Sequence, residues 1–116
     1  MKKEIQNTSD YLTLASLIAS INHRYGLFTQ NEVVILDMVC KENLANRLPF
    51  VFEIMLFENV ASQATIHAVI KLLIKKKFLT TETDPKDNRR KFVSVTNLAL
   101  KRLQECNQAI KKICKE

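Results

Sequence analysis

Apolar residues follow a helical spacing along most of the chain and alternate over only one short stretch. The first helical stripe consists of Tyr11, Leu14, Ile18, Ile21 and Tyr25. This stripe predicts an amphipathic helix over residues 9–26. Either Ser9 or Asp10 can cap its start. Gly26, the single glycine of the chain, is expected to end the helix in the left-handed conformation.

Two further helices are expected next along the chain. The segment Thr29-Gln30-Asn31-Glu32 has the form of a capping box, which predicts the start of a second helix that continues to about Glu42. Its inner side is expected to consist of Val33, Leu36, Val39 and Cys40. Pro49 suits the first turn of a short third helix, FVFEIMLFEN, whose dense apolar content predicts burial on most faces. These aromatics can belong to a core or to a ligand pocket, and the core is favoured.

A fourth helix is expected from Ser62, a good N-cap, to about Lys77. Its inward face consists of Ile66, Val69, Ile70, Leu73 and Ile74. Its outer face carries short polar groups first and lysines behind them, namely Ser62, Gln63, Thr65, His67, Ala68, Lys71 and Lys75. This order suits a helix that presents its first turns to base edges and its flank to phosphates. Without the segment that follows it, an ordinary amphipathic surface helix is the favoured interpretation.

The alternating stretch follows that helix. Residues 78–83 are β-prone, residues 92–95 alternate, and the DPKDNRRK segment between them is rich in turn formers, which predicts a hairpin. Arg89, Arg90 and Lys91 place three cations at or just after its tip. A basic hairpin beside a DNA-reading helix can enter a minor groove, where the negative potential favours arginine.

A last helix is expected over residues 96–115. Its apolar residues form a short heptad-like stripe, Ala99, Leu103, Cys106, Ile110 and Ile113. Such a stripe needs a partner surface. The first helix offers a matching one, so the two stripes can pack on each other within a monomer or form an interface between two copies.

Composition favours one mainly helical domain over residues 1–116. A chain of this length can bury one core, and a single glycine with two prolines disfavours sandwiches and barrels, which need many tight turns. No apolar run reaches the ~20 residues of a membrane span, and no signal peptide is evident. A cytoplasmic protein without a membrane partner is therefore expected.

The reactive side chains argue against an enzyme. Cys40, Cys106 and Cys114 lack C-x-x-C spacing and are expected to be buried thiols. Neither His23 nor His67 has a cysteine or carboxylate neighbour at metal-ligand spacing, and no glycine-rich phosphate loop is present. No catalytic residue, metal or cofactor is expected.

The net charge of +6 is concentrated in one region. Residues 71–91 hold eight Lys/Arg and three Asp/Glu, whereas residues 1–70 hold five and seven. A clustered basic patch is typical of a protein with a polyanionic partner, although lysines on a helix are often only a solvated face.

Two motifs in this part of the chain resemble the winged helix-turn-helix of the MarR family of bacterial transcriptional regulators. The family's D-x-R-D-x-R wing pattern is matched by Asp84, Asp87 and Arg89, with Lys86 in place of the first arginine. The S-x-A-T-(V/I) start of the family's recognition helix is matched by Ser62, Ala64, Thr65 and Ile66. In contrast, the family's K-G-L after that helix is replaced by Lys77-Phe78-Leu79.

The resemblance implies a mainly α fold with a small β-hairpin wing. Residues 29–95 would form the winged helix-turn-helix core, and residues 9–26 and 96–115 would form dimerisation helices. The implied function is that of a homodimeric regulator of transcription that binds double-stranded DNA, with the recognition helix in the major groove and the wing in the minor groove. Many relatives respond to a small aromatic effector, which is an option here. The alternative is a winged-helix protein interaction module, an adaptor or anti-activator without specific DNA binding.

The implied site residues form three sets. DNA contacts are expected from Ser62, Gln63, Thr65, His67, Lys71, Lys75, Lys86, Arg89, Arg90 and Lys91, with Arg89 as the minor-groove arginine. Asp84 and Asp87 are expected to brace the wing by pairing with its cations. The dimer interface is expected to contain Tyr11, Leu14, Ile18, Ile21, Leu103, Cys106, Ile110 and Ile113.

Overall fold

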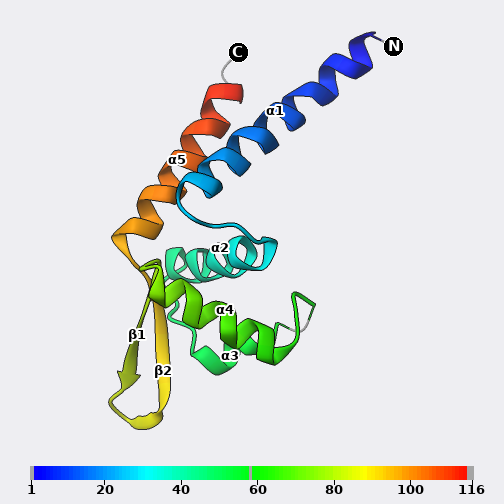
Figure 1. The fold of residues 1–116 in the computed structure, drawn as a ribbon. Coiled ribbons are helices and arrows are strands. Elements are labelled where there is room, and N and C mark those ends of the chain that lie inside the picture. Colours follow the sequence, from blue (N-terminus) through cyan, green and yellow to red (C-terminus); the bar gives the residue numbers. More distant parts are fainter. Residues whose placement is uncertain (1, 58, 115–116) are drawn as a thin grey trace. The chain divides into compact units, whose positions relative to one another are not determined.

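The computed structural model describes residues 2–57 and 59–114 and divides the chain into two compact units. One unit comprises Met1–Leu27 and Lys101–Glu116, and the other comprises Phe28–Leu100. Figure 1 labels the elements, which are α1 (Lys2–Arg24), α2 (Gln30–Leu44), α3 (Val51–Met55), α4 (Gln63–Lys75), β1 (Leu79–Asp84), β2 (Asp87–Val95) and α5 (Asn97–Cys114). The predicted fold class, mainly helical with a β-hairpin, is confirmed.

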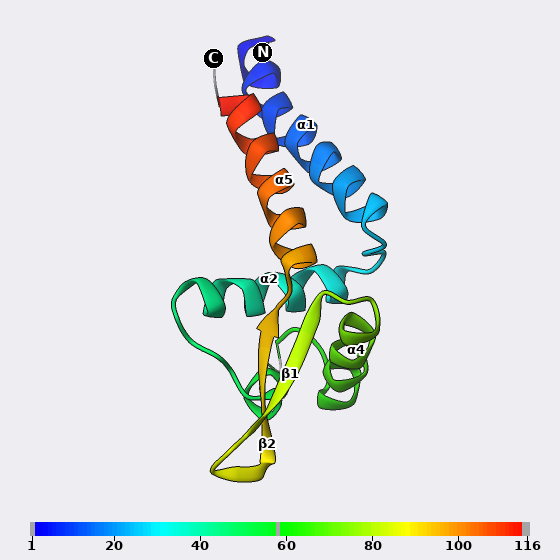
Figure 2. The same ribbon diagram turned by 90° about the vertical axis from the view of Figure 1, so that its left-hand side faces the viewer.

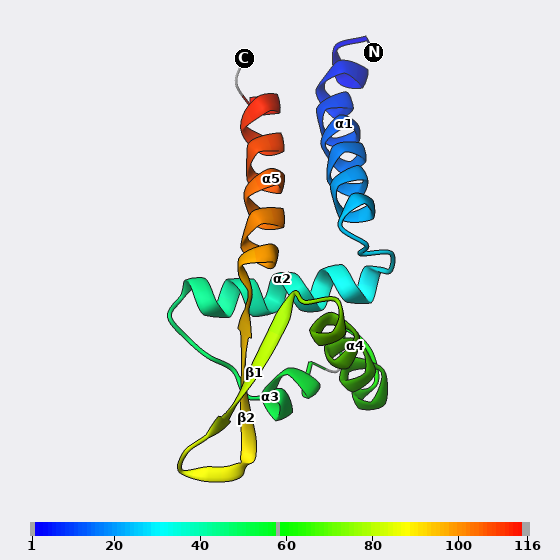
Figure 3. The same ribbon diagram turned by 60° about the vertical axis from the view of Figure 1, so that its left-hand side comes forward.

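The second unit packs α2, α3 and α4 with the hairpin (Figures 1 and 3). β1 and β2 pair antiparallel, from Leu79 opposite Val95 to Thr83 opposite Lys91. Every one of these elements contributes buried apolar side chains, among them Leu36, Ile54, Ile66, Leu73, Leu79 and Val93. Burial of this apolar surface stabilises the unit and fixes α4 beside the hairpin.

The starts of α2 and α4 coincide with the capping residues that the sequence predicts. Oγ1 of Thr29 accepts the N–H of Glu32 at 3.2 Å, and Oε1 of Glu32 accepts the N–H of Thr29 at 3.1 Å. Oγ of Ser62 accepts the N–H of Thr65 at 3.2 Å. These bonds satisfy amide groups that the first turn of a helix leaves without an intrahelical partner. Both predicted helix starts are confirmed.

The chain leaves α4 through a left-handed residue, Lys77, with φ 73°. The N–H of Phe78 donates to the carbonyl of Leu73 at 2.9 Å and that of Lys77 donates to Ile74 at 3.0 Å, which is the Schellman pattern. The left-handed residue is therefore Lys77. In the alignment with the family's K-G-L motif, the glycine corresponds to Phe78, the next residue along the chain. A lysine in this conformation holds backbone strain that glycine lacks.

Several predicted boundaries differ from the structure. α1 begins at Lys2, so neither Ser9 nor Asp10 caps it, because the preceding Lys, Glu and Gln residues are good helix formers that continue the helix. α3 covers only Val51–Met55, little more than one turn. A helix of this length buries one residue deeply, Ile54, and the predicted burial on most faces is wrong. β2 begins earlier than predicted because pairing with β1 continues into the charged segment.

The first unit consists of α1 and the part of α5 that begins at Lys101 (Figures 1 and 2). Its buried centre is Ile21, Cys106 and Ala109, and the side chains that pack against this centre are Leu14, Ile18 and Tyr25. Nε of Arg102 donates to Oδ1 of Asn22 at 2.9 Å, and both side chains are buried. Gly26 has φ 84°, which confirms its predicted left-handed role.

Polar contacts also join the two helices of the first unit. The hydroxyl of Tyr25 donates to Glu105, and NH2 of Arg24 donates to the same carboxylate at 2.8 Å. The hydrogen bond from Tyr25, followed by that from Arg24, lowers the pKa of Glu105. Cys106 is buried here, and Cys40 is buried in the second unit, as predicted. Cys114 is exposed in the last turn of α5, so the prediction of a third buried thiol is wrong.

Candidate nucleic-acid interface

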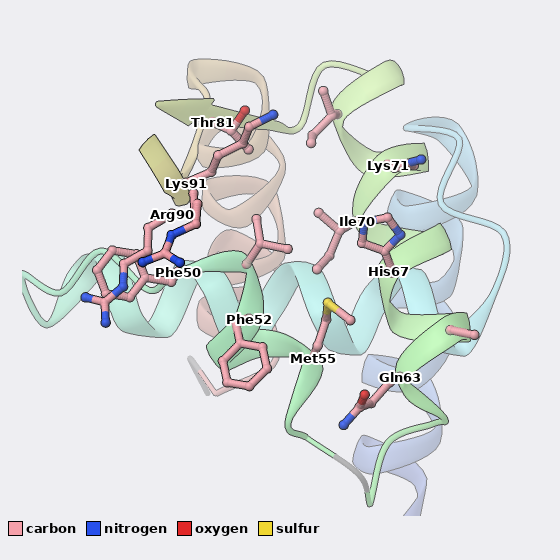
Figure 4. Close-up of a pocket in the computed structure, with 14 residues that line it drawn as sticks. Phe50, Phe52, Met55, Gln63, His67, Ile70, Lys71, Thr81, Arg90 and Lys91 are labelled. Carbon is pink, nitrogen blue, oxygen red and sulfur yellow. The ribbon is translucent and has the colours of Figure 1, made fainter. Parts of the chain in front are cut away.

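A hollow of about 660 Å³ lies between α3, α4 and the hairpin (Figure 4). One wall belongs to α4, whose residues Ile66, Val69 and Leu73 are buried in the core. The adjacent face of the helix therefore lines the hollow, with the side chains of Gln63, His67 and Lys71. Three of the residues that the sequence predicts to contact DNA thus share one wall.

The hairpin wall carries the positive charge. It consists of Thr81, Arg89, Arg90 and Lys91. Together with Lys71 these residues surround the hollow with cations, and none of the described residues that line it is acidic. The electrostatic field in the hollow therefore favours an anionic group.

Asp87 forms ion pairs with both arginines of this wall. Its Oδ1 accepts the backbone N–H of Arg89 at 3.0 Å and lies 3.2 Å from Nε of the same residue, and its Oδ2 lies 3.8 Å from Nε of Arg90. The backbone bond and then the side-chain bond from Arg89 keep the pKa of Asp87 below its ordinary value of 3.8. The carboxylate is ionised at neutral pH, while the side chain of Arg89 remains 90% exposed.

Asp84 has a different role from the one expected. Its Oδ1 accepts the backbone N–H of Lys86 at 2.9 Å, and the side chain is buried. It thus stabilises the turn through the backbone, where pairing with a cation of the wing was expected. Lys86 in the turn and Lys75 on α4 are exposed and lie outside the hollow lining. The hydroxyls of Ser62 and Thr65 bond to each other at 3.0 Å.

Comparison with known proteins identifies this arrangement. Residues 28–99 match the winged helix DNA-binding domain family. The chain belongs to this family. The matched residues include α4 and the β1–β2 hairpin, which the sequence predicts to be the recognition helix and the wing. Among curated proteins, none matches the chain significantly in sequence.

Solved structures share the fold across nearly the whole chain. The MepR–DNA complex from S. aureus is 13% identical with a TM-score of 0.74, and the alignment covers 97% of this chain and 86% of that one. The transcriptional regulator Tm0710 from Thermotoga maritima is 19% identical with a TM-score of 0.67, over 97% and 78%. MarR is 16% identical with a TM-score of 0.64, over 97% and 78%. The predicted likeness to MarR-family winged helix regulators is confirmed.

The root of the wing is fixed to the start of α3. The rings of Phe50 and Phe92 stack with centroids 4.6 Å apart, and the two residues form a β-bridge. The guanidinium carbon of Arg90 lies 4.8 Å from the centroid of the Phe50 ring. The N–H of Val93 donates to the carbonyl of Pro49 at 2.8 Å. Arg90 therefore packs on an aromatic ring as well as facing the hollow.

The α3 wall is the part of this site for which the sequence favoured a core position over a pocket. Its apolar lining residues are Phe50, Val51, Phe52 and Met55. Phe52 is 65% exposed, although the sequence favoured a core position for it. The available signal was the density of aromatic and aliphatic residues in α3, which exceeds what one short helix can bury.

The residues predicted for a dimer interface divide into two groups. Leu14, Ile18, Ile21 and Cys106 pack together within the first unit of the single chain. Tyr11 is 71% exposed and Ile110 is 42% exposed, while Leu103 and Ile113 are half-buried. Leu12 and Leu17 on α1 are also exposed, and the sequence stripe omitted them from the interface.

The described residues include no candidate metal site. They contain no group of three or more His, Cys, Asp or Glu side chains that could hold a metal ion. None of the helices in the described ranges is long and apolar enough to cross a membrane. His23 is exposed on α1 of the first unit, and His67 lines the hollow.

Proposed function

We propose that this chain is a bacterial transcriptional regulator that binds double-stranded DNA sequence-specifically, as a homodimer in the cytoplasm. One observation carries the proposal. In a chain of a DNA-binding family, the helix α4 and the hairpin enclose a hollow. All charged residues among the described lining residues are basic. Phosphates bind such a surface with release of counterions, and polar side chains on the helix can hydrogen-bond to base edges.

The contacts follow from this arrangement. α4 enters the major groove with its first turns, and the side chains that approach the bases are Gln63, Thr65 and His67, with Ser62 at the cap. The phosphates are bound by Lys71 and Lys75 along the helix and by Lys86, Arg90 and Lys91 on the wing. Arg89, the most exposed of the wing cations that pair with Asp87, enters the minor groove.

The homodimer is supported by exposed apolar side chains on the first unit, chiefly Tyr11 and Ile110. A two-fold dimer presents two recognition helices to half-sites about 34 Å apart. Its operator should therefore be a near-palindrome.

The charge of Arg89 provides the test. Arg89→Ala is expected to weaken binding about tenfold, because a desolvated arginine in a narrow minor groove is lost. The probe is a fluorescent duplex taken from the intergenic DNA beside the chain's own gene, titrated by anisotropy at several salt concentrations. The plot of log Kd against log salt should become shallower by about one unit per protomer.

Lys41→Ala is the matched control, because Lys41 is an exposed cation on α2 outside the hollow. This variant is expected to keep both the affinity and the salt dependence of the unmodified chain. Weak binding to every duplex, equal in all three proteins, would contradict DNA recognition and favour the protein interaction module.

A further inference from the structure

The hollow has one charged wall and one apolar wall, and phosphate binding alone does not require the apolar wall. Arg90 and Lys91 supply charge on the wing side, whereas Phe52 and Met55 present carbon surface on the α3 side (Figure 4). Phe52 leaves about two thirds of its surface in water, on the face proposed to meet DNA. A large exposed apolar side chain inside a cationic site indicates an occupant that has both charge and apolar surface.

We propose that the α3 wall receives the carbon surface of one DNA strand, with Phe52 as the main contact, while Arg90 and Lys91 of the opposite wall bind that strand's phosphates. This inference rests on the proposed function. The carbon that Phe52 meets is a thymine methyl group or a deoxyribose face, which are the apolar surfaces that duplex DNA exposes. α3 thereby becomes a third reading element beside the recognition helix and the wing.

Charge complementarity selects DNA as the occupant. The basic lining residues are Lys71, Arg89, Arg90 and Lys91, and no described lining residue is acidic. A neutral apolar segment of a protein would fill the hollow at the cost of desolvating these cations, whereas a nucleic-acid strand neutralises them.

The position of Phe52 gives the contact a consequence for specificity. Met55 lies between Phe52 and the first turns of α4, which carry Gln63 and His67 (Figure 4). An apolar contact at this end of the hollow lies beside the side chains proposed to bond to base edges. If the carbon surface is a thymine methyl group, the α3 wall adds methyl recognition to the hydrogen-bond recognition by α4.

The experiment compares two exposed phenylalanines of the second unit. Phe52→Ala is expected to weaken binding to the duplex beside the chain's own gene about fivefold to twentyfold, as partial loss of a buried aromatic surface predicts. The salt dependence should stay unchanged, because no cation is removed. Phe28→Ala is the control, since Phe28 is 64% exposed and lies outside the hollow. It is expected to bind DNA like the unmodified chain.

The same duplex synthesised with deoxyuridine in place of thymidine lacks the thymine methyl groups. It therefore distinguishes a contact with a methyl group from a contact with deoxyribose. If Phe52 contacts methyl groups, the unmodified chain binds the deoxyuridine duplex about threefold more weakly per lost contact, and Phe52→Ala no longer distinguishes the two duplexes. If it contacts deoxyribose, Phe52→Ala loses the same factor on both duplexes. Either result supports the inference.

Two results would overturn it. Tight binding by Phe52→Ala, equal to that of the unmodified chain, would show that the apolar wall lies off the DNA and serves a protein or a small molecule. A loss accompanied by a shallower salt dependence would show that the substitution disturbed the cations. In both cases the unmodified chain still binds DNA and the proposed function stands. Failure of the unmodified chain to bind any duplex would instead refute the proposed function itself.

Discussion

Glu32 is a single buried carboxylate that connects the start of α2 to the end of the recognition helix. Its Oε1 accepts the backbone N–H of Thr29 at 3.1 Å and the hydroxyl of Thr29 at 2.9 Å, and its Oε2 lies 2.5 Å from Nζ of Lys76. The side chain of Glu32 is 2% exposed. The capping role of Glu32 is visible in the local sequence. Its pairing with Lys76 is not, because 44 residues separate the two.

The pH dependence of stability tests this residue. Burial raises the pKa of Glu32, but the hydrogen bonds from Lys76 and Thr29 lower it more, so the pKa lies below its ordinary value of 4.5. A carboxylate whose pKa is lower in the folded than in the unfolded state stabilises the fold at pH values above its unfolded-state pKa. This stabilisation is lost as the pH falls through the folded-state pKa. Glu32→Gln is expected to lower the free energy of unfolding by about 2 kcal/mol at neutral pH. Urea unfolding at pH 7 and at pH 4 measures whether the difference shrinks in acid.

Glu53→Gln provides the comparison, because Glu53 caps α3 through the N–H of Phe50 at 2.8 Å but is exposed. A smaller destabilisation is expected from it, about 1 kcal/mol or less. The assignment to Glu32 fails if both variants lose the same stability, or if the loss in Glu32→Gln is unchanged at pH 4.

At the scale of elements, local chemistry predicts the starts of α2 and α4 but not that of α1, and it does not predict the surfaces that elements share. Thr29 and Ser62 cap their helices as the sequence indicates, because capping involves residues only a few positions apart. The hollow draws its lining from α3, α4 and both strands of the hairpin. The Phe50–Phe92 stack joins residues distant in sequence, and no periodicity within either segment marks it.

The ends of two helices allow a paired prediction of opposite sign. Lys77→Gly is expected to stabilise the protein by about 0.5–1 kcal/mol, because the left-handed strain of a lysine exceeds the entropy that glycine loses on folding. Gly26→Ala is expected to destabilise it by about 1 kcal/mol for the same reason in reverse. A Cβ at Gly26 would meet nothing within 4 Å, so the effect isolates the backbone. Thermal and urea unfolding of both variants check the two signs, and a shared sign would refute this account.

At the scale of the whole molecule, apolar periodicity identified faces that need partners without identifying the partners. Ile21 and Cys106 belong to the predicted stripes, yet they pack against each other's helices inside one chain. Tyr11 and Ile110 belong to the same stripes and remain exposed. A stripe on a helix has the same sequence signature in both cases, because only the direction of each face in the folded chain distinguishes them.

The exposed members of the stripes test the proposed dimer. Tyr11→Glu and Ile110→Glu are each expected to raise the dimer dissociation constant at least about tenfold, because each places a charge in an apolar interface. Sedimentation velocity over a range of protein concentrations measures the change. Leu44→Glu is the control, since Leu44 is an exposed leucine of the second unit. A monomeric unmodified chain, or equal dimerisation of all variants, would contradict an interface at these residues.

The contact between Phe50, Arg90 and Phe92 has a mechanical consequence. Phe50 is the N-cap residue of α3, while Arg90 and Phe92 belong to the strand that carries the wing's cations. α3 also packs against the recognition helix. A displacement of α3 would therefore move α4 and the wing together as one rigid helix–wing unit. If two copies dimerise as proposed, we expect the distance between their two helix–wing units to determine DNA affinity, because the shape of each unit is fixed by these contacts.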